Sequence, residues 1–255
     1  MIQINKGDSP PNLAATQTRK NREMNEAYDK KPNDYINDVE KFSFGKSYNT
    51  DEVRNLLAKK QHNKCCFSEA RFVGDYSDVE HFRPKGRVDS FPDNVPSYPG
   101  YYWLAYEWEN LFLCKTRPNT SQKRNYFPLY NEANRNCSHN DTYVELPKLI
   151  DPGKENPRDF IRFRNDEPIS IDLEDRGQFN IDFFNLRHPE FEEGRRTKLK
   201  TIILLKKLVD KLLSIGLPID DPEIAESIDL LRYERSAEAQ FSSMAIDVLL
   251  GWHHM

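Results

Sequence analysis

A charged stretch in the first third of the chain, DYSDVEHFRPKGRV at residues 75–88, places a carboxylate directly beside a histidine. Carboxylate oxygens suit Mg²⁺ or Mn²⁺, and a neutral imidazole is a suitable base near physiological pH. Glu80 and His81 would therefore supply a metal ligand and a water-activating base from one backbone segment. The cations that follow are candidates for contact with a phosphate group: Arg83, Lys85 and Arg87. This combination is what metal-assisted hydrolysis of a phosphodiester requires.

The same stretch also has a purely structural interpretation. Adjacent Glu and His residues arise often by chance, and a surface strand that leads into a proline turn can carry charge without any catalytic role. The rest of the chain must therefore decide between the two interpretations.

The segments that would position these residues predict a mixed architecture. Residues 63–83 alternate weakly between apolar and polar side chains, which predicts a β-hairpin of two short strands with its turn at VGDYSD. Residues 101–114 (YYWLAYEWENLFLC) are rich in aromatic side chains and predict a buried segment. Residues 131–195 carry turn signals and strand-like runs such as PISIDL and QFNIDFF, which predicts a mixed segment.

Both ends of the chain are predicted to contain more helix than its middle. Residues 1–20 are polar and contain proline, which predicts an extended surface segment, whereas residues 20–60 predict helices with a capping candidate at Asn49-Thr50. After residue 190, apolar side chains recur at three- and four-residue intervals, and this spacing predicts a helical region. A helical packing region is the simpler interpretation of that spacing, and a partner-binding helix is the alternative.

Composition limits the class of protein. Aromatic residues make up 12% of the 255 residues, which argues against disorder, and the formal net charge of −4 excludes a protein that coats nucleic acid through bulk charge. Residues 81–125 nevertheless hold seven basic and four acidic side chains, so a polyanion would bind in the middle of the chain. Since no stretch approaches the length of a membrane span and the start shows no signal-peptide core, we expect a soluble, cytoplasmic protein without a membrane partner.

Several motifs together resemble one known family, the HNH endonucleases of the ββα-metal fold. The resemblance covers roughly residues 60–195, and the subgroup it indicates contains the HNH subunit of Septu-type anti-phage systems (PtuB-like proteins, some of them encoded with retrons). The matching segments are DVEHFRPK (78–85), YYWLAYEWENL (101–111), Asn119, Lys123, FPL (127–129), LIDPGKENPRDFIRF (149–163) and FNLRHPEFEEGR (184–195).

The resemblance implies an α+β fold with an embedded ββα-metal HNH core at residues 61–135. The core would be preceded by an extended and helical N-terminal segment (1–60). It would be followed by a mixed segment that packs on the core (136–195) and by a helical C-terminal region (196–255).

The resemblance also implies roles for single residues. His81 would be the general base, Asn110 would order the catalytic loop and orient the histidine, and Lys123 would meet the phosphate or the leaving group. Glu80 and Asn119 would bind a catalytic Mg²⁺ or Mn²⁺, with Asp78 on the same strand face as a reserve ligand. Without the resemblance, Asn110 is better explained as the cap of a turn, Asn119 is explained equally well as a helix N-cap, and Lys123 is by default a solvated lysine.

The chain departs from many HNH proteins at the cysteine pairs that hold a structural zinc. Ser68 stands where the partner of Cys65 is expected, and Pro118 stands where the partner of Cys114 is expected. Because two of the four thiolates are missing, tetrahedral zinc would lose most of its affinity. We expect no structural zinc, and we expect the aromatic side chains around Phe67 to hold this segment together.

Three functions remain open from the sequence. The first is an active DNA nuclease in anti-phage defence beside an ABC/SMC-like ATPase subunit, as the subgroup resemblance implies. The second uses the same site on structured RNA such as tRNA, because the site acts on the phosphodiester and not on the sugar. The third is a non-catalytic nucleic-acid-binding or scaffold subunit, which a catalytically inactive relative would be.

Overall fold

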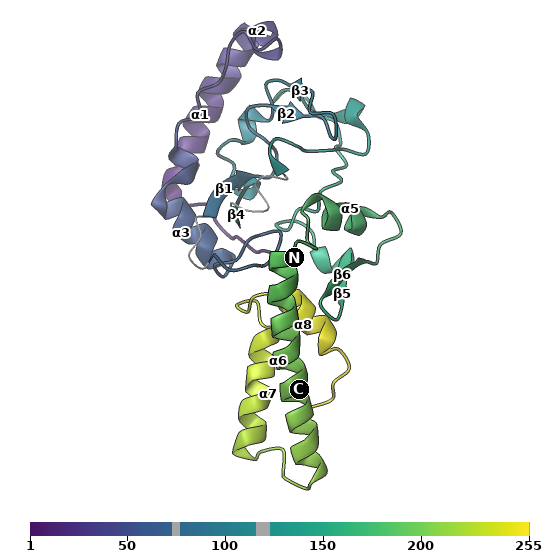
Figure 1. The fold of residues 1–255 in the computed structure, drawn as a ribbon. Coiled ribbons are helices and arrows are strands. Elements are labelled where there is room, and N and C mark those ends of the chain that lie inside the picture. The colour runs from purple at the N-terminus through teal and green to yellow at the C-terminus, as the bar shows by residue number, and fades with distance from the viewer. Residues whose placement is uncertain (73–76, 116–122, 255) are drawn as a thin grey trace.

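The computed structural model describes residues 1–72, 77–115 and 123–254 of the chain, and these residues form an α+β fold (Figure 1). Within the described residues the strands pair into three two-stranded antiparallel sheets. The strands are β1 (Ser77–His81), β2 (Val88–Asp89), β3 (Pro96–Ser97), β4 (Leu111–Lys115), β5 (Ile161–Arg164) and β6 (Glu167–Ser170).

The strand that carries Glu80 and His81 pairs with a distant partner. In the pairing of β1 with β4, Glu80 lies opposite Phe112 and His81 lies opposite Leu111. The prediction of a hairpin within residues 63–83 is therefore wrong, and residues 64 and 71 share only an isolated bridge. All five residues of β4 are buried, so pairing with β4 covers far more apolar surface than a local hairpin would.

Strand β4 is buried on both faces because two hydrophobic clusters meet there. Phe112 and Cys114 point into one cluster, which contains Phe67 and Phe184, and the rings of those two stack with centroids 3.9 Å apart. Leu111 and Leu113 point into the other cluster, which is built from the N-terminal helices and the aromatic segment after residue 100. The expected burial of that segment is confirmed, since Tyr102, Tyr106 and Trp108 are almost completely inaccessible.

The N-terminal segment is helical earlier than predicted. Helix α1 (Pro11–Lys30) begins at a proline, which suits the first helical position because no amide hydrogen is needed there. The predicted extended segment therefore ends near Pro10. Helices α2 (Pro32–Ile36) and α3 (Asp51–Lys60) follow. The hydroxyl of Thr50 caps α3 by accepting from the amide of Val53 at 3.4 Å, which confirms the capping candidate.

The strand-like run QFNIDFF is also a helix, α5 (Arg176–Phe183), which corrects the prediction for this run. The carboxylate of Asp172 accepts hydrogen bonds from the amides of Arg176 at 2.8 Å and Gly177 at 2.9 Å, and so satisfies the start of the helix. Short 3₁₀ segments complete the body of the molecule: η1 (Ser47–Asn49), η2 (Tyr102–Leu104), η3 (Trp108–Asn110), η4 (Glu132–Asn134) and η5 (Pro157–Asp159).

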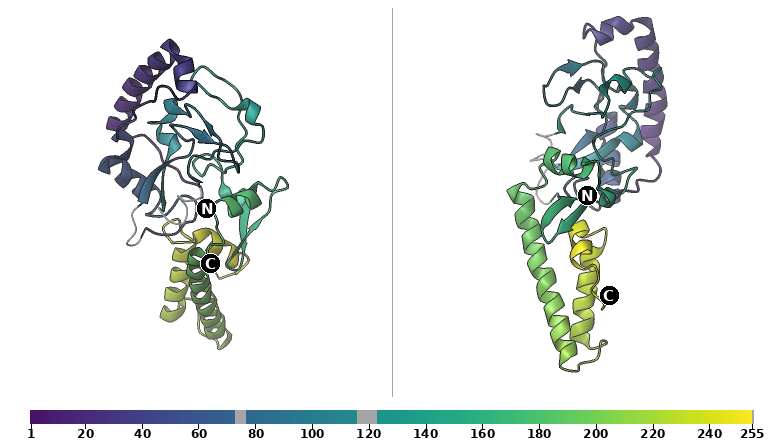
Figure 2. Two further views of the ribbon diagram at one scale, coloured as in Figure 1. Left: turned by 45° about the horizontal axis from the view of Figure 1, so that its top comes forward. Right: turned by 90° about the vertical axis from the view of Figure 1, so that its right-hand side faces the viewer.

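The C-terminal region is helical, as predicted. Helices α6 (Pro189–Ser214) and α7 (Pro222–Arg235) form an antiparallel pair that projects from the body, and α8 (Ser242–Val248) packs near its base (Figures 1 and 2). Gly216, with a φ of +91°, lies in the turn that follows α6. None of the helices in the described part of the chain has the length and apolar character needed to cross a bilayer.

Candidate active site

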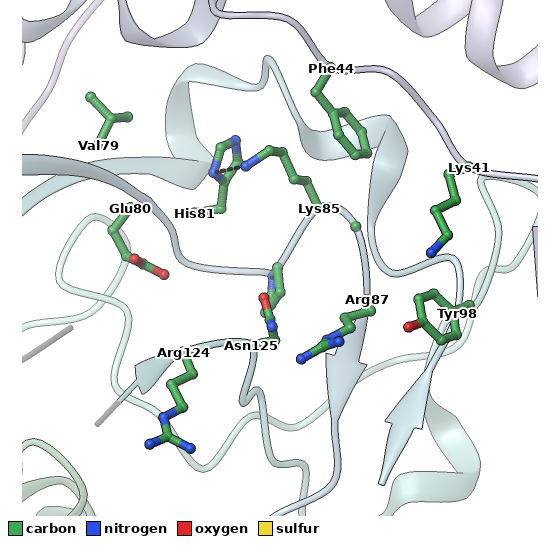
Figure 3. A pocket seen from close by; sticks show the side chains of 12 residues that line it. Lys41, Phe44, Val79, Glu80, His81, Lys85, Arg87, Tyr98, Arg124 and Asn125 are labelled. Carbon is green, nitrogen blue, oxygen red and sulfur yellow. Dashed lines mark hydrogen bonds between the residues drawn. The ribbon is translucent and has the colours of Figure 1, made fainter. Parts of the chain in front are cut away.

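A cavity of about 440 Å³ opens beside the end of β1, and both Glu80 and His81 line it (Figure 3). Lys85 and Arg87, two of the three cations predicted to contact phosphate, also line this cavity. The pairing of β1 with β4 fixes the strand end, where the carboxylate and the imidazole leave opposite faces of the strand and both still line the cavity. The structure therefore brings the central residues of the sequence prediction to one cavity.

His81 is held in one tautomer by its neighbours. Its Nε2 lies 2.9 Å from the carbonyl oxygen of Ala105, and because a carbonyl can only accept, Nε2 carries the hydrogen. Nδ1 is then the unprotonated nitrogen, and the ammonium of Lys85 lies 3.4 Å from it. The edge-on ring of Tyr48, with centroids 4.6 Å apart, also contacts the imidazole.

The environment keeps His81 neutral. Burial is the largest cause and the ammonium of Lys85 the next, and together they lower the pKa of His81 from 6.5 to about 3. The imidazole is therefore unprotonated throughout the physiological range. A base with so low a pKa is weak, so catalysis by His81 requires that substrate binding raise its pKa.

Asn110 ties together the two backbone segments around His81. Its Oδ1 accepts from the amide of Arg83 at 2.7 Å, and its Nδ2 donates to the carbonyls of Arg83 and Leu104, each at 3.0 Å. Leu104 directly precedes Ala105, whose carbonyl fixes the His81 tautomer. Asn110 is 5% exposed and acts as a positioning residue, because it orders the loop that orients the histidine.

Lys123 is not a solvated lysine. Its side chain is 2% exposed, and its Nζ lies 3.0 Å from Oε1 of Glu80 and 2.9 Å from the carbonyl oxygen of His81. The ammonium therefore neutralises the Glu80 carboxylate from inside the protein. Its predicted contact with a phosphate or leaving group stays a prediction.

The expected metal ligands are only partly described. Glu80 lines the cavity, whereas Asp78 is exposed and lies opposite Cys114 in the strand pairing. Asn119 lies outside the described residues. Within residues 1–72, 77–115 and 123–254, no three His, Cys, Asp or Glu side chains are grouped as a metal site. The hard oxygens of Glu80 suit Mg²⁺ or Mn²⁺, but on their own the described residues do not complete the site.

Arg83 points away from this cavity. Its guanidinium forms an ion pair with Glu145 and lies over the ring of Phe127, 4.6 Å from the centroid. It lines a separate cavity on the far side of the segment, together with Phe82 and Asp151. Of the three predicted phosphate contacts, the structure thus places Lys85 and Arg87 in the cavity with Glu80 and His81 and directs Arg83 toward Glu145.

Sequence reasoning missed several residues of the cavity: Lys41, Phe44, Tyr98, Arg124 and Asn125. Arg124 and Asn125 directly follow Lys123, so their adjacency to a predicted site residue could have identified them from the sequence. Lys41 and Phe44 come from the loop between α2 and η1, about forty residues before His81, and no local pattern links them to the site.

The cysteines of the expected zinc knuckle are buried. Cys65, Cys66 and Cys114 belong to the first hydrophobic cluster, and these three side chains form no disulfide. Ser68, which replaces a knuckle cysteine, makes hydrogen bonds with Cys65 and accepts from the amide of Ala70 at 3.3 Å. Pro118 lies outside the described residues. The expectation of no structural zinc therefore stays a prediction, although the packing of Phe67 on Phe184 agrees with a segment held by aromatic contacts.

Replacing Lys85 by methionine should raise the pKa of His81. The change removes the ammonium that opposes protonation at Nδ1, so we expect the pKa of His81 to rise but to stay below 6.5, because burial is the larger cause. The measurement is an NMR titration of the His81 ring toward low pH, with the exposed Lys59→Met as the control. An unchanged His81 midpoint in Lys85→Met would contradict the assigned contact.

Comparison with known proteins gives one relevant similarity. Over 203 aligned residues the chain is 32% identical to the Septu protein PtuB of Bacillus mycoides (strain KBAB4). The alignment covers 78% of this chain and 64% of that protein, so the chain spans less than two thirds of its relative's length. No family model matches the chain.

Proposed function

From the similarity to a Septu protein PtuB, we propose that the chain is a metal-dependent HNH endonuclease that hydrolyses phosphodiester bonds of DNA in anti-phage defence. The observation that carries the proposal is the neutral imidazole of His81, whose Nδ1 faces the ammonium of Lys85 in a cavity that Glu80 and several cations also line. A ββα-metal core is part of the proposal, and the antiparallel pairing of β1 with β4 supports it.

His81 would take the proton from the attacking water at Nδ1. The carbonyl of Ala105 would then stabilise the imidazolium through the Nε2–H hydrogen bond. Asn110 would keep that carbonyl in place through its bond to Leu104. The contacts of Ala105 and Asn110 already exist before substrate binds, so these two groups need little reorganisation at the moment of reaction.

Lys85 would couple substrate binding to the strength of the base. In the structure its ammonium faces Nδ1 and lowers the pKa of His81. A bound phosphate attracts this ammonium and offsets its charge, so the pKa of His81 would rise when substrate enters. The base would thus become stronger only where there is a phosphodiester to attack.

A divalent ion held by Glu80 and Asn119 would polarise the phosphoryl oxygen and stabilise the leaving oxygen. Until the ion binds, Lys123 supplies the positive charge next to Glu80. Arg87 and Arg124 line the same cavity and would contact flanking phosphates.

An ABC/SMC-like ATPase would be the partner of this nuclease. The chain carries a net charge of −4, and its cations are concentrated around one cavity, so its own electrostatic affinity for nucleic acid is modest. A partner that holds the substrate would supply the missing affinity.

The test is a cleavage assay of the purified chain, alone and together with an ABC/SMC-like ATPase if a neighbouring gene encodes one. Duplex DNA, single-stranded DNA and tRNA are each incubated with Mg²⁺, Mn²⁺ or EDTA. Cleavage of DNA that EDTA stops supports the proposal, whereas cleavage of tRNA alone reassigns the substrate to RNA. Binding without cleavage under every condition identifies a non-catalytic subunit and overturns the proposal.

Replacing Glu80 by glutamine should lower the affinity of the site for the metal ion. The amide oxygen can still accept from Lys123, but the negative charge that attracts the ion is lost, so the metal concentration for half-maximal cleavage should rise about tenfold or more. Glu192→Gln, which removes an exposed carboxylate on α6, is the control and should leave this concentration unchanged. If Glu80→Gln and wild type need the same metal concentration for half-maximal cleavage, Glu80 is excluded as a metal ligand.

A further inference from the structure

The cavity beside His81 extends well beyond the groups that hydrolysis needs. Glu80 and His81 lie at one end, and Phe44, Lys41 and Tyr98 lie at the other (Figure 3). A volume of about 440 Å³ falls within the usual range of roughly 300–1,000 Å³ for small-molecule sites, whereas a phosphate group alone is much smaller. The second end therefore has room for a further part of the substrate.

The chemistry of that second end differs from the catalytic end. Phe44 is half-buried, and the ammonium of Lys85 lies over its ring, 5.7 Å from the centroid. Tyr98 is also half-buried, and its hydroxyl is hydrogen bonded to Arg87. Lys41 is exposed at the edge, where it pairs with Asp38 at 3.2 Å. Aromatic rings interleaved with cations are typical of surfaces that bind single-stranded nucleic acid.

The position of Phe44 is maintained by its surroundings. The ring lies against Gly86, where an added Cβ would come within 3.5 Å of Phe44 Cε2, and against Phe42, with centroids 6.3 Å apart. Gly86 belongs to the same segment as Lys85, so the aromatic ring and the phosphate-facing cation are fixed relative to each other. A base stacked on Phe44 would therefore have a defined position relative to His81.

We infer that this end of the cavity is a base-binding subsite, in which the base of one unpaired nucleotide next to the scissile phosphate stacks on Phe44. Any base has a π-face, so the subsite accepts DNA or RNA without sequence preference. In a duplex the bases are stacked on each other and reach the ring only if they are flipped out, so the subsite selects single-stranded or locally unpaired substrate. The inference rests on the proposed nuclease function and names the substrate class of that site.

The subsite is tested by binding in EDTA, where metal-dependent cleavage cannot occur. Fluorescence anisotropy measures the affinity of the full chain for a single-stranded DNA, the single-stranded RNA of the same sequence, and the matching DNA duplex. Phe44→Ala should weaken binding of both single strands about tenfold and leave duplex binding unchanged, because one base–aromatic stack is lost. Tyr143→Ala removes an aromatic side chain that is 59% exposed outside the cavity, and it should change none of these affinities.

Two further variants separate stacking from packing. Phe44→Leu keeps an apolar side chain against Gly86 but has no π-face, so it should lose affinity as Phe44→Ala does. Phe44→Trp keeps the π-face and should bind single strands as well as wild type. The subsite is overturned if Phe44→Leu binds single strands as tightly as wild type. It is also overturned if Phe44→Ala loses as much affinity for the duplex as for the single strands.

The two proposals can fail separately. A chain that binds single strands through Phe44 but cuts nothing retains the subsite and loses the nuclease function. A chain that cuts duplex and single strand equally, with Phe44→Ala as active as wild type on both, retains the nuclease function and loses the subsite.

Discussion

The rate of DNA cleavage should fall about 10³-fold when His81 is replaced by alanine, the usual contribution of a positioned general base. His81 is the imidazole in the cavity, its tautomer is set by Ala105, and its Nδ1 is the nitrogen that can accept a proton. Single-turnover cleavage at saturating Mn²⁺ measures the loss. Binding of uncleaved DNA in EDTA should change little, because the cations of the cavity remain.

A second variant keeps this test informative if the alanine protein is unstable. His81→Gln places an amide N–H near the position of Nε2, where it can donate to the carbonyl of Ala105, but it has no basic nitrogen, so the fold should be preserved and cleavage should still be lost. His62→Ala, which removes a histidine near Glu238 on the surface, is the matched control and should be fully active. Cleavage by His81→Gln at the wild-type rate would remove His81 from the mechanism.

Replacing Asn110 by alanine should lower both stability and activity. The change leaves the amide and carbonyl of Arg83 without their partner, while the carbonyl of Leu104 keeps a bond from the amide of Glu107 at 3.3 Å. Two unsatisfied buried groups of this kind cost about 3 kcal/mol in the free energy of unfolding. The loop that holds Ala105 would loosen, so we expect the cleavage rate to fall about 100-fold even in well-folded protein. Urea unfolding and single-turnover cleavage measure the two effects.

Asn180 offers a closely matched control for Asn110. Its Oδ1 accepts from the amide of Ile150 at 3.0 Å, and its Nδ2 donates to the carbonyls of Lys148 and Arg176, each at 2.8 Å. Asn180 is completely buried in a part of the chain that does not line the cavity. Asn180→Ala should therefore lower the free energy of unfolding about as much as Asn110→Ala does. The protein that remains folded should cleave at the wild-type rate. If both variants lose activity in proportion to stability, Asn110 has only a structural role.

The charge of His81 links the site to acid stability. The pKa of His81 is about 3 in the folded chain and near 6.5 when the chain unfolds, so the unfolded state binds the proton more readily. The contribution of the neutral imidazole to the free energy of unfolding is present in full above pH 6.5 and is lost as the pH falls from 6.5 toward 3. The same burial that fixes the base thus makes the site sensitive to acid.

Local patterns in the sequence were sufficient for features that depend on neighbouring residues. The three- and four-residue spacing after residue 190 correctly predicted the helical C-terminal region, and Thr50 correctly predicted the start of α3. The adjacency of Glu80 and His81 placed both side chains at one strand end before any tertiary contact was known. A helix cap, an amphipathic face and a dipeptide are all determined within a few residues of chain.

The tertiary structure decided the strand pairing and the side-chain contacts that join residues far apart in the sequence. Strand β1 pairs with β4, some thirty residues later, because β4 lies between two apolar clusters and covers more surface than a local hairpin. The tautomer of His81 depends on a carbonyl twenty-four residues away, and Arg83 turns toward Glu145 instead of the cavity.

The sequence by itself thus determined the residues that can do the chemistry. The structure decided which of them share the cavity and added Phe44 and Lys41 from the N-terminal loop. The physical reason is that burial, ion pairing and base-binding surfaces arise from packing between segments, and no local pattern records which segments will meet.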